Sequence, residues 1–434
     1  MDGNITAVIG IVVMLALIFL GVNIGLSMFI IGFVGYAYVL NPNAALSVLG
    51  TYSTSSSMTY TMTVIPLFVL MGNFAFYSGI SNGLFTTSRV LMGRARGSLA
   101  YAGIVACALF GSICGSLAAT TATMSRVAKP VMAEHGYKPE IIGGVLACSG
   151  TLGTLIPPST PFIIFGIMTE TSIGKLFAAG IFPGIVMAAC FCVCVFILGK
   201  ADSNAFPSGQ RYSVKEKIFS LKGYLGMFIL FLLVLGGIFT GATSVTEAAA
   251  IGAAVSLIIL IAKRMFTKGN VRESLFDTIK TLGMVMITLV GANMFGTFLT
   301  VTNLPTNLAK WINSLDVPSV FVIIIIIVVY AVLGCVMDTL ALMILSTPIF
   351  VPIIVALGYD VVWFGVIIVM IMNMGAVTPP VGLSCYVASG VMKIPLGTVF
   401  RGVVPFLIAF VASLVIVIAF PQTALFLPSI VRGG

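Results

Sequence analysis

Uninterrupted apolar segments long enough to cross a bilayer follow one another along this chain. A helix needs about 20 mostly apolar residues to span the hydrocarbon core. The first segment, MDGNITAVIGIVVMLALIFLG, has neither a basic start nor an A-x-A site, so it is interpreted as a span and not as a cleavable signal. Strands of membrane barrels alternate apolar and polar residues, whereas these runs are continuous. Only 8% of the 434 residues are charged, against about 25% in soluble domains, so the sequence predicts an all-α polytopic membrane protein.

The second half of the chain repeats the first at an offset of 222 positions. At this offset the pair Pro157-Pro158 corresponds to Pro379-Pro380, and Pro183 corresponds to Pro405. Self-similarity at a fixed offset indicates a duplicated structural unit. The sequence therefore predicts two homologous halves, residues 1–210 and residues 215–434.

Each half contains an apolar segment with a polar centre. In the first half, Leu99 to Ala133 includes the polar stretch GSICGSLAATTATMSR. Each arm has about 16 residues and would reach ~24 Å as a helix, short of the ~30 Å hydrocarbon core. We therefore predict a re-entrant helical hairpin at about 99–134 and its counterpart at about 319–357.

Each half also contains an apolar segment that a helix cannot cross unbroken. The two stretches are GTLGTLIPPSTPFIIF, from Gly150 to Phe165, and NMGAVTPPVGLSCY, from Asn373 to Tyr386. We predict broken membrane helices at about 139–168 and 361–391, with each proline pair in the first turn of a new half-helix, where a missing N–H costs little. The alternative is a proline kink with a packing role.

The basic residues predict an inverted relation between the two halves. Most of the 21 Lys and Arg residues fall into segments that an outside N-terminus places on the inner side, including loops at about 89–96 and 263–280. Each half then has five crossings and one hairpin. An odd number of crossings makes the second half start on the opposite side, so the repeats are predicted to be inverted.

Paired broken helices in inverted repeats indicate a binding site near the middle of the membrane. Irregular backbone at that depth survives only when it is buried in protein or lines a cavity. Freed carbonyl groups can replace the hydration shell of Na⁺, and the N-termini of half-helices attract anions. The sequence thus predicts a secondary transporter that couples an anion to Na⁺.

Two Na⁺ sites are predicted, one for each half. Asp338 lies at the tip of the second hairpin, and an ionisable residue inside the membrane is a functional candidate by default. Ser116 is its counterpart in the first hairpin. The candidate ligands are Asp338, Thr339, Asn373, Gly375 and Thr378 for one ion, and Ser116, Gly150, Gly153 and Thr154 for the other. The alternative for Asp338 is a structural acid paired across a helix interface, and Ser116 is equally compatible with plain helix packing.

Three other polar residues have two interpretations each. Arg126 follows a run of hydroxyl residues in the first hairpin, so it is either a partner for a substrate carboxylate or a side chain that snorkels to the inner surface. Glu247 follows Thr246 near the end of a span, where a contact at the helix start is as plausible as an ion site. His135 is interpreted as a turn residue in preference to a proton relay.

Several classes of function are not supported. The net charge of +9 is explained by basic inner loops, so no nucleic-acid partner is expected. All eight cysteines lie in apolar segments and are interpreted as small core residues. The sequence contains neither a Walker A pattern nor a catalytic motif, so neither ATP use nor enzyme activity is expected.

Three motifs resemble the large membrane subunit of TRAP transporters, the tripartite ATP-independent periplasmic family. They are CSGTLGTLIPPSTPFIIFGIMTETSIGKLFAAGIFPG from Cys148, TEAAAIG from Thr246 and NMGAVTPPVG from Asn373. The resemblance covers nearly the whole chain. It implies uptake of an organic anion across the bacterial inner membrane, driven by a Na⁺ gradient. It also implies two protein partners, a small four-helix membrane subunit and a soluble periplasmic binding protein.

The same resemblance implies an elevator mechanism and a set of site residues. The hairpins and broken helices, about 99–170 and 319–391, would move against a scaffold. Ser116 and Asp338 match positions near Na⁺, and Ser159 and Thr160 match positions near substrate. The complete set of candidate substrate-binding residues is Ser159, Thr160, Thr120, Thr121, Arg126 and Ser384.

The resemblance leaves the substrate open among C4-dicarboxylates, sialic acids, 2-oxo acids and ectoine-like solutes. Arg126 and Lys129 stand where many dicarboxylate members would have uncharged residues, so sialic acid is favoured. Two other functions remain as alternatives, an autonomous Na⁺-coupled anion transporter and an anion channel.

Overall fold

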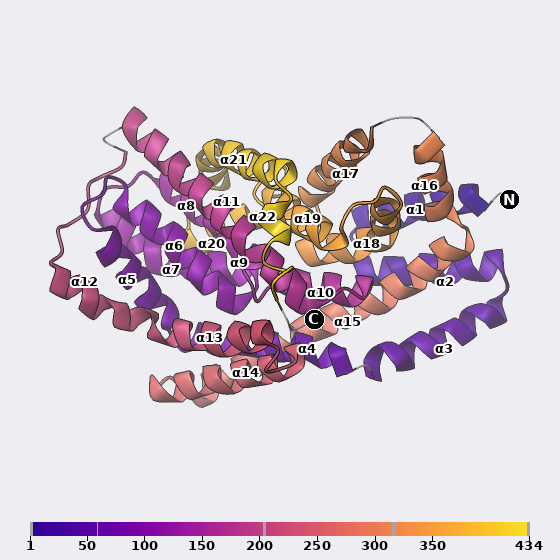
Figure 1. The fold of residues 1–434 in the computed structure, drawn as a ribbon, viewed down its shortest axis with the longest axis horizontal. Helices are drawn as coiled ribbons and strands as arrows, with labels where there is room; N and C mark the ends of the chain where they lie inside the picture. The colour runs from indigo at the N-terminus through magenta and orange to yellow at the C-terminus, as the bar shows by residue number, and fades with distance from the viewer. Residues whose placement is uncertain (1–2, 59, 203–204, 315–317, 432–434) are drawn as a thin grey trace.

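A computed structural model describes residues 3–58, 60–202, 205–314 and 318–431 of the chain (Figure 1). The described residues form helices and loops, with one isolated β-bridge between Arg96 and Ser208. Among them, seven helices are long and apolar enough to cross a membrane, or eight if the bent pair α4–α5 counts as one span. The predicted all-α polytopic membrane protein is confirmed.

The helices of the first half are distributed as follows. They are α1 (Gly3–Phe19), α2 (Ile24–Val39), α3 (Pro42–Met58), α4 (Val64–Tyr77), α5 (Ile80–Met92), α6 (Ser98–Cys114), α7 (Leu117–Glu134), α8 (Pro139–Gly150), α9 (Leu152–Leu155), α10 (Thr160–Thr169) and α11 (Ile173–Ala201). A 3₁₀ turn, Tyr60–Thr63, precedes α4.

The second half follows a similar order. Its helices are α12 (Val214–Ser220), α13 (Leu225–Thr240), α14 (Val245–Ala262), α15 (Lys268–Val301), α16 (Leu304–Ser314), α17 (Ser319–Gly334), α18 (Thr339–Ala356), α19 (Val361–Gly375), α20 (Leu383–Met392), α21 (Leu396–Ala419) and α22 (Gln422–Leu425). A second 3₁₀ turn, Leu221–Tyr224, joins α12 to α13.

Arg94 and Arg96 lie in a loop after α5, as predicted, but most of the second predicted basic loop is helical, and that part of the prediction is wrong. Arg89 lies in the last turn of α5, and α15 begins at Lys268, so Lys280 is also helical. Polar residues on a helix that packs on other helices do not interrupt it, because side chains at 3.6-residue spacing can face different surroundings. As a consequence, Lys280 lies within a helix and not in a loop.

The segments predicted as hairpins are pairs of helices joined by short tips, and their re-entrant course in the membrane stays a prediction. Between α6 and α7 there are two residues, Gly115 and Ser116, and α6 packs against α7. Gly115 has φ +59°, a left-handed conformation that glycine adopts without a Cβ penalty. Between α17 and α18 the tip runs from Cys335 to Asp338.

Both predicted broken helices are also present. The first consists of α8, α9 and α10, and the second of α19 and α20. The proline pairs do not begin half-helices as predicted. Pro157-Pro158 and Pro379-Pro380 both contain cis peptide bonds and lie within the breaks, and Pro161 is the proline in the first turn of α10.

Element boundaries recur at the spacing found in the sequence. The first residue of α7 is Leu117 and that of α18 is Thr339, 222 positions later, and α8 and α19 begin with the same offset at Pro139 and Val361. The order of hairpin, broken helix and long helix is the same in both halves. The inverted orientation of the two halves stays a prediction.

The broken helices lie in the middle of the molecule. Figure 1 shows α9, α10, α19 and α20 between α21 on one side and α13, α14 and α15 on the other. Within the segment 139–169 the most apolar stretch is 89% buried, compared with 33% for α11. Irregular backbone is thereby kept away from lipid, which cannot satisfy its polar groups.

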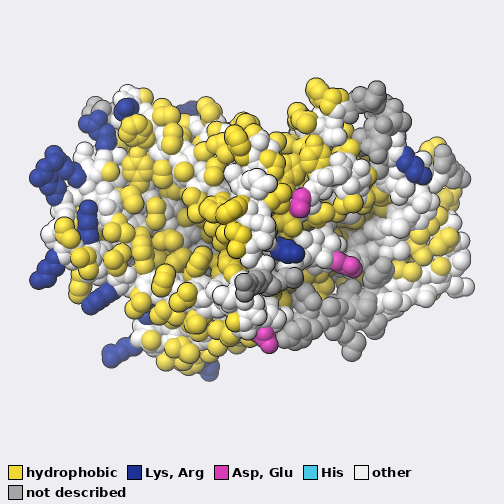
Figure 2. Space-filling view, viewed as in Figure 1, with side chains coloured by type: hydrophobic (Ala, Val, Ile, Leu, Met, Phe, Trp, Pro, Cys, Tyr) yellow, Lys and Arg dark blue, Asp and Glu magenta, His cyan; other side chains and the backbone are white. Residues whose placement is uncertain are grey.

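Basic side chains are concentrated away from this centre. Figure 2 shows most of the visible Lys and Arg side chains gathered at the end of the molecule formed by α5 and α12, beside a broad apolar surface. Apolar side chains are exposed along α1, α11 and α13, among them Val12, Ile197 and Phe228. Such a surface is suited to contact with lipid chains.

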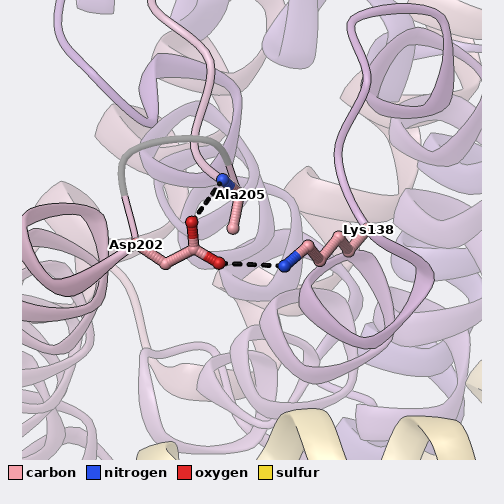
Figure 3. Close-up of polar contacts among 3 residues, drawn as sticks. All are labelled: Lys138, Asp202 and Ala205. Carbon is pink, nitrogen blue, oxygen red and sulfur yellow. Dashed lines mark hydrogen bonds and ion pairs between the residues drawn. The ribbon is translucent and has the colours of Figure 1, made fainter.

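An ion pair joins the loop between the first hairpin and the first broken helix to the end of α11. Lys138 Nζ lies 2.9 Å from Asp202 Oδ2, and Ala205 N donates to Asp202 Oδ1 (Figure 3). The Asp202 carboxylate raises the pKa of Lys138 through this hydrogen bond. Both side chains are exposed, so the pair positions the end of α11 and adds little stability.

Candidate functional site

Four helix N-termini converge on one cavity of about 580 Å³. The first residues of these helices line it: Leu117 of α7, Thr160 of α10, Thr339 of α18 and Leu383 of α20. Two of these helices belong to the hairpins and two to the broken helices. Since the helix dipole favours negative charge at an N-terminus, this wall is electrostatically suited to an anion, with the N-terminus of α20 left without a side-chain cap.

The opposite wall of the cavity comes from two other helices. α4 contributes Val69, Gly72 and Asn73, and α15 contributes Asp277, Lys280, Thr281 and Met284. The two helices pack against each other. The cavity therefore lies between the α4–α15 pair and the hairpins and broken helices, while α4 also contacts α6 and α15 also contacts α18.

The tip of the first hairpin is docked on the first broken helix. The Ser116 side chain caps α7 by accepting from Ala119 N at 3.4 Å. Thr160 N donates to the Gly115 carbonyl at 3.4 Å, and a Cβ on Gly115 would lie 2.9 Å from the Pro158 carbonyl oxygen. The hairpin tip and the start of α10 thus form one backbone-packed unit at the cavity.

The tip of the second hairpin has the same construction. Asp338 caps α18, with Leu340 N donating to its Oδ2 at 3.1 Å, and it corresponds in sequence to Ser116. A Cβ on Gly375 would lie 2.6 Å from the Gly334 carbonyl carbon. The close contact of these two glycines joins the end of α17 to the end of α19.

The two breaks meet through Thr154 and Asn373. The Thr154 hydroxyl lies 2.8 Å from the Thr151 carbonyl oxygen and 2.6 Å from Asn373 Oδ1. Asn373 is fully buried, and its Nδ2 has no hydrogen-bond partner among the described residues. This pair links the two halves of the protein directly at the level of the broken helices.

The number of hydroxyl protons limits which hydrogen bonds Thr154 and Asn373 can form. A threonine hydroxyl has one proton, so it cannot donate to both the Thr151 carbonyl and Asn373 Oδ1. With the amide turned over, Asn373 Nδ2 donates to Thr154 Oγ1, and Thr154 donates to Thr151. Both groups are then satisfied, and Asn373 Oδ1 is left as a free buried acceptor. A buried oxygen without a donor is a ligand suited to a hard cation such as Na⁺.

The remaining candidate substrate residues are engaged elsewhere. Thr121 and Ser384 share a hydrogen bond of 2.9 Å, and Ser384 donates to the Ala147 carbonyl at 2.7 Å. Thr120 donates to the Ser116 carbonyl at 2.8 Å. Ser159 caps α10 and also donates to the Thr154 carbonyl. These hydroxyls join hairpin to broken helix.

The structure brings only part of the predicted site to the cavity. From the two predicted sets, the residues that line it are Ser116, Thr154, Thr160, Asp338 and Thr339. Arg126 is exposed on α7 and is not among the lining residues. Thr378 is half-buried and donates to the Met374 carbonyl at 2.6 Å.

The predicted glycines of the first Na⁺ site lie at close approaches between elements. A Cβ on Gly153 would lie 2.6 Å from Thr120 Oγ1, and a Cβ on Gly150 would lie 1.9 Å from Thr121 Oγ1. The glycines let α7 pack directly against the broken helix. Coordination of Na⁺ by their carbonyl groups stays a prediction.

Four polar residues of the cavity were missed in the sequence. Asn73, Asp277, Lys280 and Thr281 line the wall formed by α4 and α15. Asn73 stands alone in an apolar run, which is a usable signal, whereas Asp277 and Lys280 follow a basic segment that resembles a loop. Only the packing of α15 on α4 places them at the cavity.

Two open alternatives are decided by the structure. Glu247 Oε2 accepts from both Ser244 N and Ser244 Oγ, at 2.7 and 2.9 Å, in a capping box at the start of α14. The interpretation as a helix-start contact is thus confirmed. His135 ends α7, with its Nδ1 2.8 Å from the Val131 carbonyl oxygen, in agreement with a turn residue.

Comparison with known proteins identifies the family. Residues 11–423 match the family described as "Tripartite ATP-independent periplasmic transporter, DctM component". The chain belongs to this DctM family. The match covers both hairpins and both broken helices, which confirms the family that the three motifs resemble.

Relatives of this DctM-family chain are named for different substrates. It is 34% identical to the C4-dicarboxylate TRAP transporter large permease protein DctM of Pseudomonas aeruginosa, over 85% of this chain and 86% of the relative. It is 32% identical to the sialic acid TRAP transporter large permease protein SiaM of Vibrio cholerae, over 96% and 97%. Similar identity to both leaves the substrate open.

A solved transporter structure shares the fold. The YdaH transporter of Alcanivorax borkumensis superposes with a TM-score of 0.61 over 87% of this chain and 88% of that one, at 15% identity. The architecture is therefore that of a known class of membrane transporters. The chain is a permease component.

Proposed function

We propose that this chain moves an organic anion into a bacterial cell together with Na⁺, as the large membrane subunit of a three-part transporter. The observation that carries the proposal is the convergence of four helix N-termini on one cavity next to two broken helices. The N-termini favour the anion, and the carbonyl groups freed in the breaks favour the cation. A cavity of about 580 Å³ is within the range of about 300–1,000 Å³ usual for small-molecule sites.

Two Na⁺ ions are proposed as co-substrates, one at each hairpin tip. Asp338 and Thr339 with Asn373, Gly375 and Thr378 would hold one ion. Ser116 with Gly150, Gly153 and Thr154 would hold the other. The Asn373 amide supports the first site, because turning it over would place an unpaired oxygen in the buried space between the breaks.

The tripartite family supports two partners for this chain. A periplasmic binding protein would deliver the anion, and a small four-helix membrane subunit would accompany the permease. We propose location in the bacterial inner membrane with the N-terminus in the periplasm. The gathering of basic side chains at the α5–α12 end supports this orientation, because that end would face the cytoplasm (Figure 2).

Alternating access is proposed to follow the division of the cavity walls. The hairpins and broken helices would move with the substrate as one body, in the manner of an elevator. The α4–α15 wall would belong to the scaffold. Sialic acid is the favoured substrate, with C4-dicarboxylates and 2-oxo acids as the other candidates.

Uptake into proteoliposomes tests the function. The chain is reconstituted with its small subunit, an inward Na⁺ gradient, the binding protein and radiolabelled sialic acid, followed by C4-dicarboxylates and 2-oxo acids. Uptake that requires both Na⁺ and the binding protein is expected. Na⁺-dependent uptake without the binding protein would indicate an autonomous transporter, and flux without Na⁺ dependence would indicate a channel.

Asp338→Ala tests the ion site itself. The substitution is expected to abolish Na⁺-coupled uptake, because it removes the acidic group that faces the cavity from the tip of the second hairpin. Monodisperse protein in size-exclusion chromatography shows that the fold is kept. Normal Na⁺ dependence in this variant would remove Asp338 from the site.

A further inference from the structure

The α4–α15 wall of the cavity carries a positive charge that none of the arguments above uses. Among the described lining residues, Lys280 is the only Lys or Arg. It faces the cavity from α15, opposite the four helix N-termini, and its side chain is exposed. It has no hydrogen bond or ion pair with any described residue, so its ammonium group is available to a ligand.

The neighbours of Lys280 are held in place by contacts between α4 and α15. Tyr77 OH donates to Asp277 Oδ2 at 3.1 Å. Asn73 Nδ2 donates to Thr278 Oγ1 at 2.9 Å and to the Ser274 carbonyl at 3.3 Å. The turn of α15 that carries Lys280 is therefore fixed on α4, while the lysine itself is free to reach across the cavity.

The charge balance of the cavity gives Lys280 a role. Two carboxylates line it, Asp277 and Asp338, and both oppose the entry of an anion. Bound Na⁺ would offset Asp338 on the hairpin side. On the other side, Lys280 is one turn of α15 away from Asp277 and would offset that charge. A flexible ammonium group with three donors can also bind a carboxylate directly.

We propose that Lys280 determines specificity by binding the carboxylate of the transported anion from the α4–α15 wall, while the helix N-termini hold the anion from the other wall. This inference rests on the proposed function. It assigns to Lys280 the role that the sequence suggested for Arg126, because Lys280 lines the cavity and Arg126 does not.

The test is Lys280→Gln in the complete reconstituted transporter, compared with wild type. The variant is expected to raise the KM of the anion about tenfold or more, since loss of one charge-assisted contact of about 1.4 kcal/mol is a tenfold change. The Na⁺ concentration for half-maximal uptake should stay the same. Lys280→Arg, which keeps the charge, should restore most of the affinity.

A second readout separates binding from a purely structural role. Competition by the anion and by its uncharged amide is compared at equal concentrations. Wild type should prefer the carboxylate strongly, and Lys280→Gln should lose most of this preference. Lys268→Gln is the matched control, because Lys268 is an exposed cation of the same helix that does not line the cavity.

The possible outcomes distinguish the role of Lys280 from the proposed function. An unchanged KM and an unchanged preference for the carboxylate in Lys280→Gln, with normal wild-type uptake, would overturn the role of Lys280 and leave the proposed function standing. A raised KM in Arg126→Gln alone would move the role to the hairpin cation. No anion uptake by wild type would overturn the proposed function, and this inference with it.

Discussion

Asn373 and Thr154 form one of the side-chain contacts between the two halves, at the level of the broken helices. A buried amide oxygen that nothing satisfies is costly unless a ligand binds it. Asn373 is therefore the candidate ligand at the breaks for the Na⁺ proposed above. The sequence placed both residues in the ion sites from the composition of the breaks, and the structure adds that they contact each other.

Asn373→Leu tests this residue-scale interpretation. Leucine has a similar volume but no oxygen, so we expect the Na⁺ concentration for half-maximal uptake to rise about tenfold or more, since about 1.4 kcal/mol corresponds to tenfold. The maximal rate at saturating Na⁺ should change less. Ser346→Ala serves as control, because Ser346 is buried but donates within its own helix. Unaltered Na⁺ dependence in Asn373→Leu would exclude the amide as a ligand.

At the scale of elements, the hairpins and broken helices are packed through glycine. A Cβ on Gly111 would lie 2.2 Å from the Gly153 Cα, so α6 and the first break meet backbone to backbone. Such contacts tolerate no added methyl group without displacement of the backbone. The hairpin and the broken helix are therefore expected to behave as one body.

Gly153→Ala should destabilise the protein by about 1–3 kcal/mol, because the new methyl group overlaps the hairpin. Gly283→Ala is the matched control: Gly283 is also helical, but nothing lies within 4 Å of its Cβ position. It should be neutral or slightly stabilising, because alanine has less freedom in the unfolded chain. Thermal unfolding of both variants in detergent measures the difference. Equal melting temperatures would show that the packing is loose.

A cross-link between elements tests whether the two cavity walls move apart. A Cβ on Gly72 of α4 would lie 3.1 Å from the Cα of Cys114, at the end of α6. Gly72→Cys should therefore form a disulfide with the native Cys114 and tie the α4 wall to the first hairpin. We expect oxidation to stop uptake and a reductant to restore it.

The control for the cross-link is Gly72→Ala, which adds a Cβ at the same position but cannot form a disulfide. Its uptake should not respond to the oxidant. Full activity of the cross-linked protein, with the bond verified by mass spectrometry, would contradict movement between these walls.

At the scale of the whole molecule, the inverted arrangement is the largest prediction still to be tested. Single cysteines at Lys268 and Lys310, both exposed in the structure, are placed in a background without the native cysteines. A membrane-impermeant thiol reagent applied to intact cells should label position 310 and not position 268. Labelling of both positions from one side would contradict the inverted repeats.

The sequence by itself determined the membrane class, the two hairpins, the two breaks and the family. These features depend on local properties: apolar length, proline and glycine in apolar runs, and a repeat that preserves spacing. The tip residues Ser116 and Asp338 were found for the same reason, because a polar residue in the middle of an apolar segment can be recognised in the sequence alone. Even the recurrence of α7 and α18 at the same offset follows from the repeat.

Only the tertiary structure decided which polar groups face the cavity. Lys280 and Asp277 belong to a helix whose start resembles a basic loop, and Asn73 stands alone in an apolar run, so neither spacing nor composition brings them together. Arg126 lies in the polar centre of the first hairpin, yet it is exposed outside the cavity. The physical reason is that the direction of a side chain depends on the rotation of each helix against its neighbours, and the glycine contacts between distant segments set that rotation.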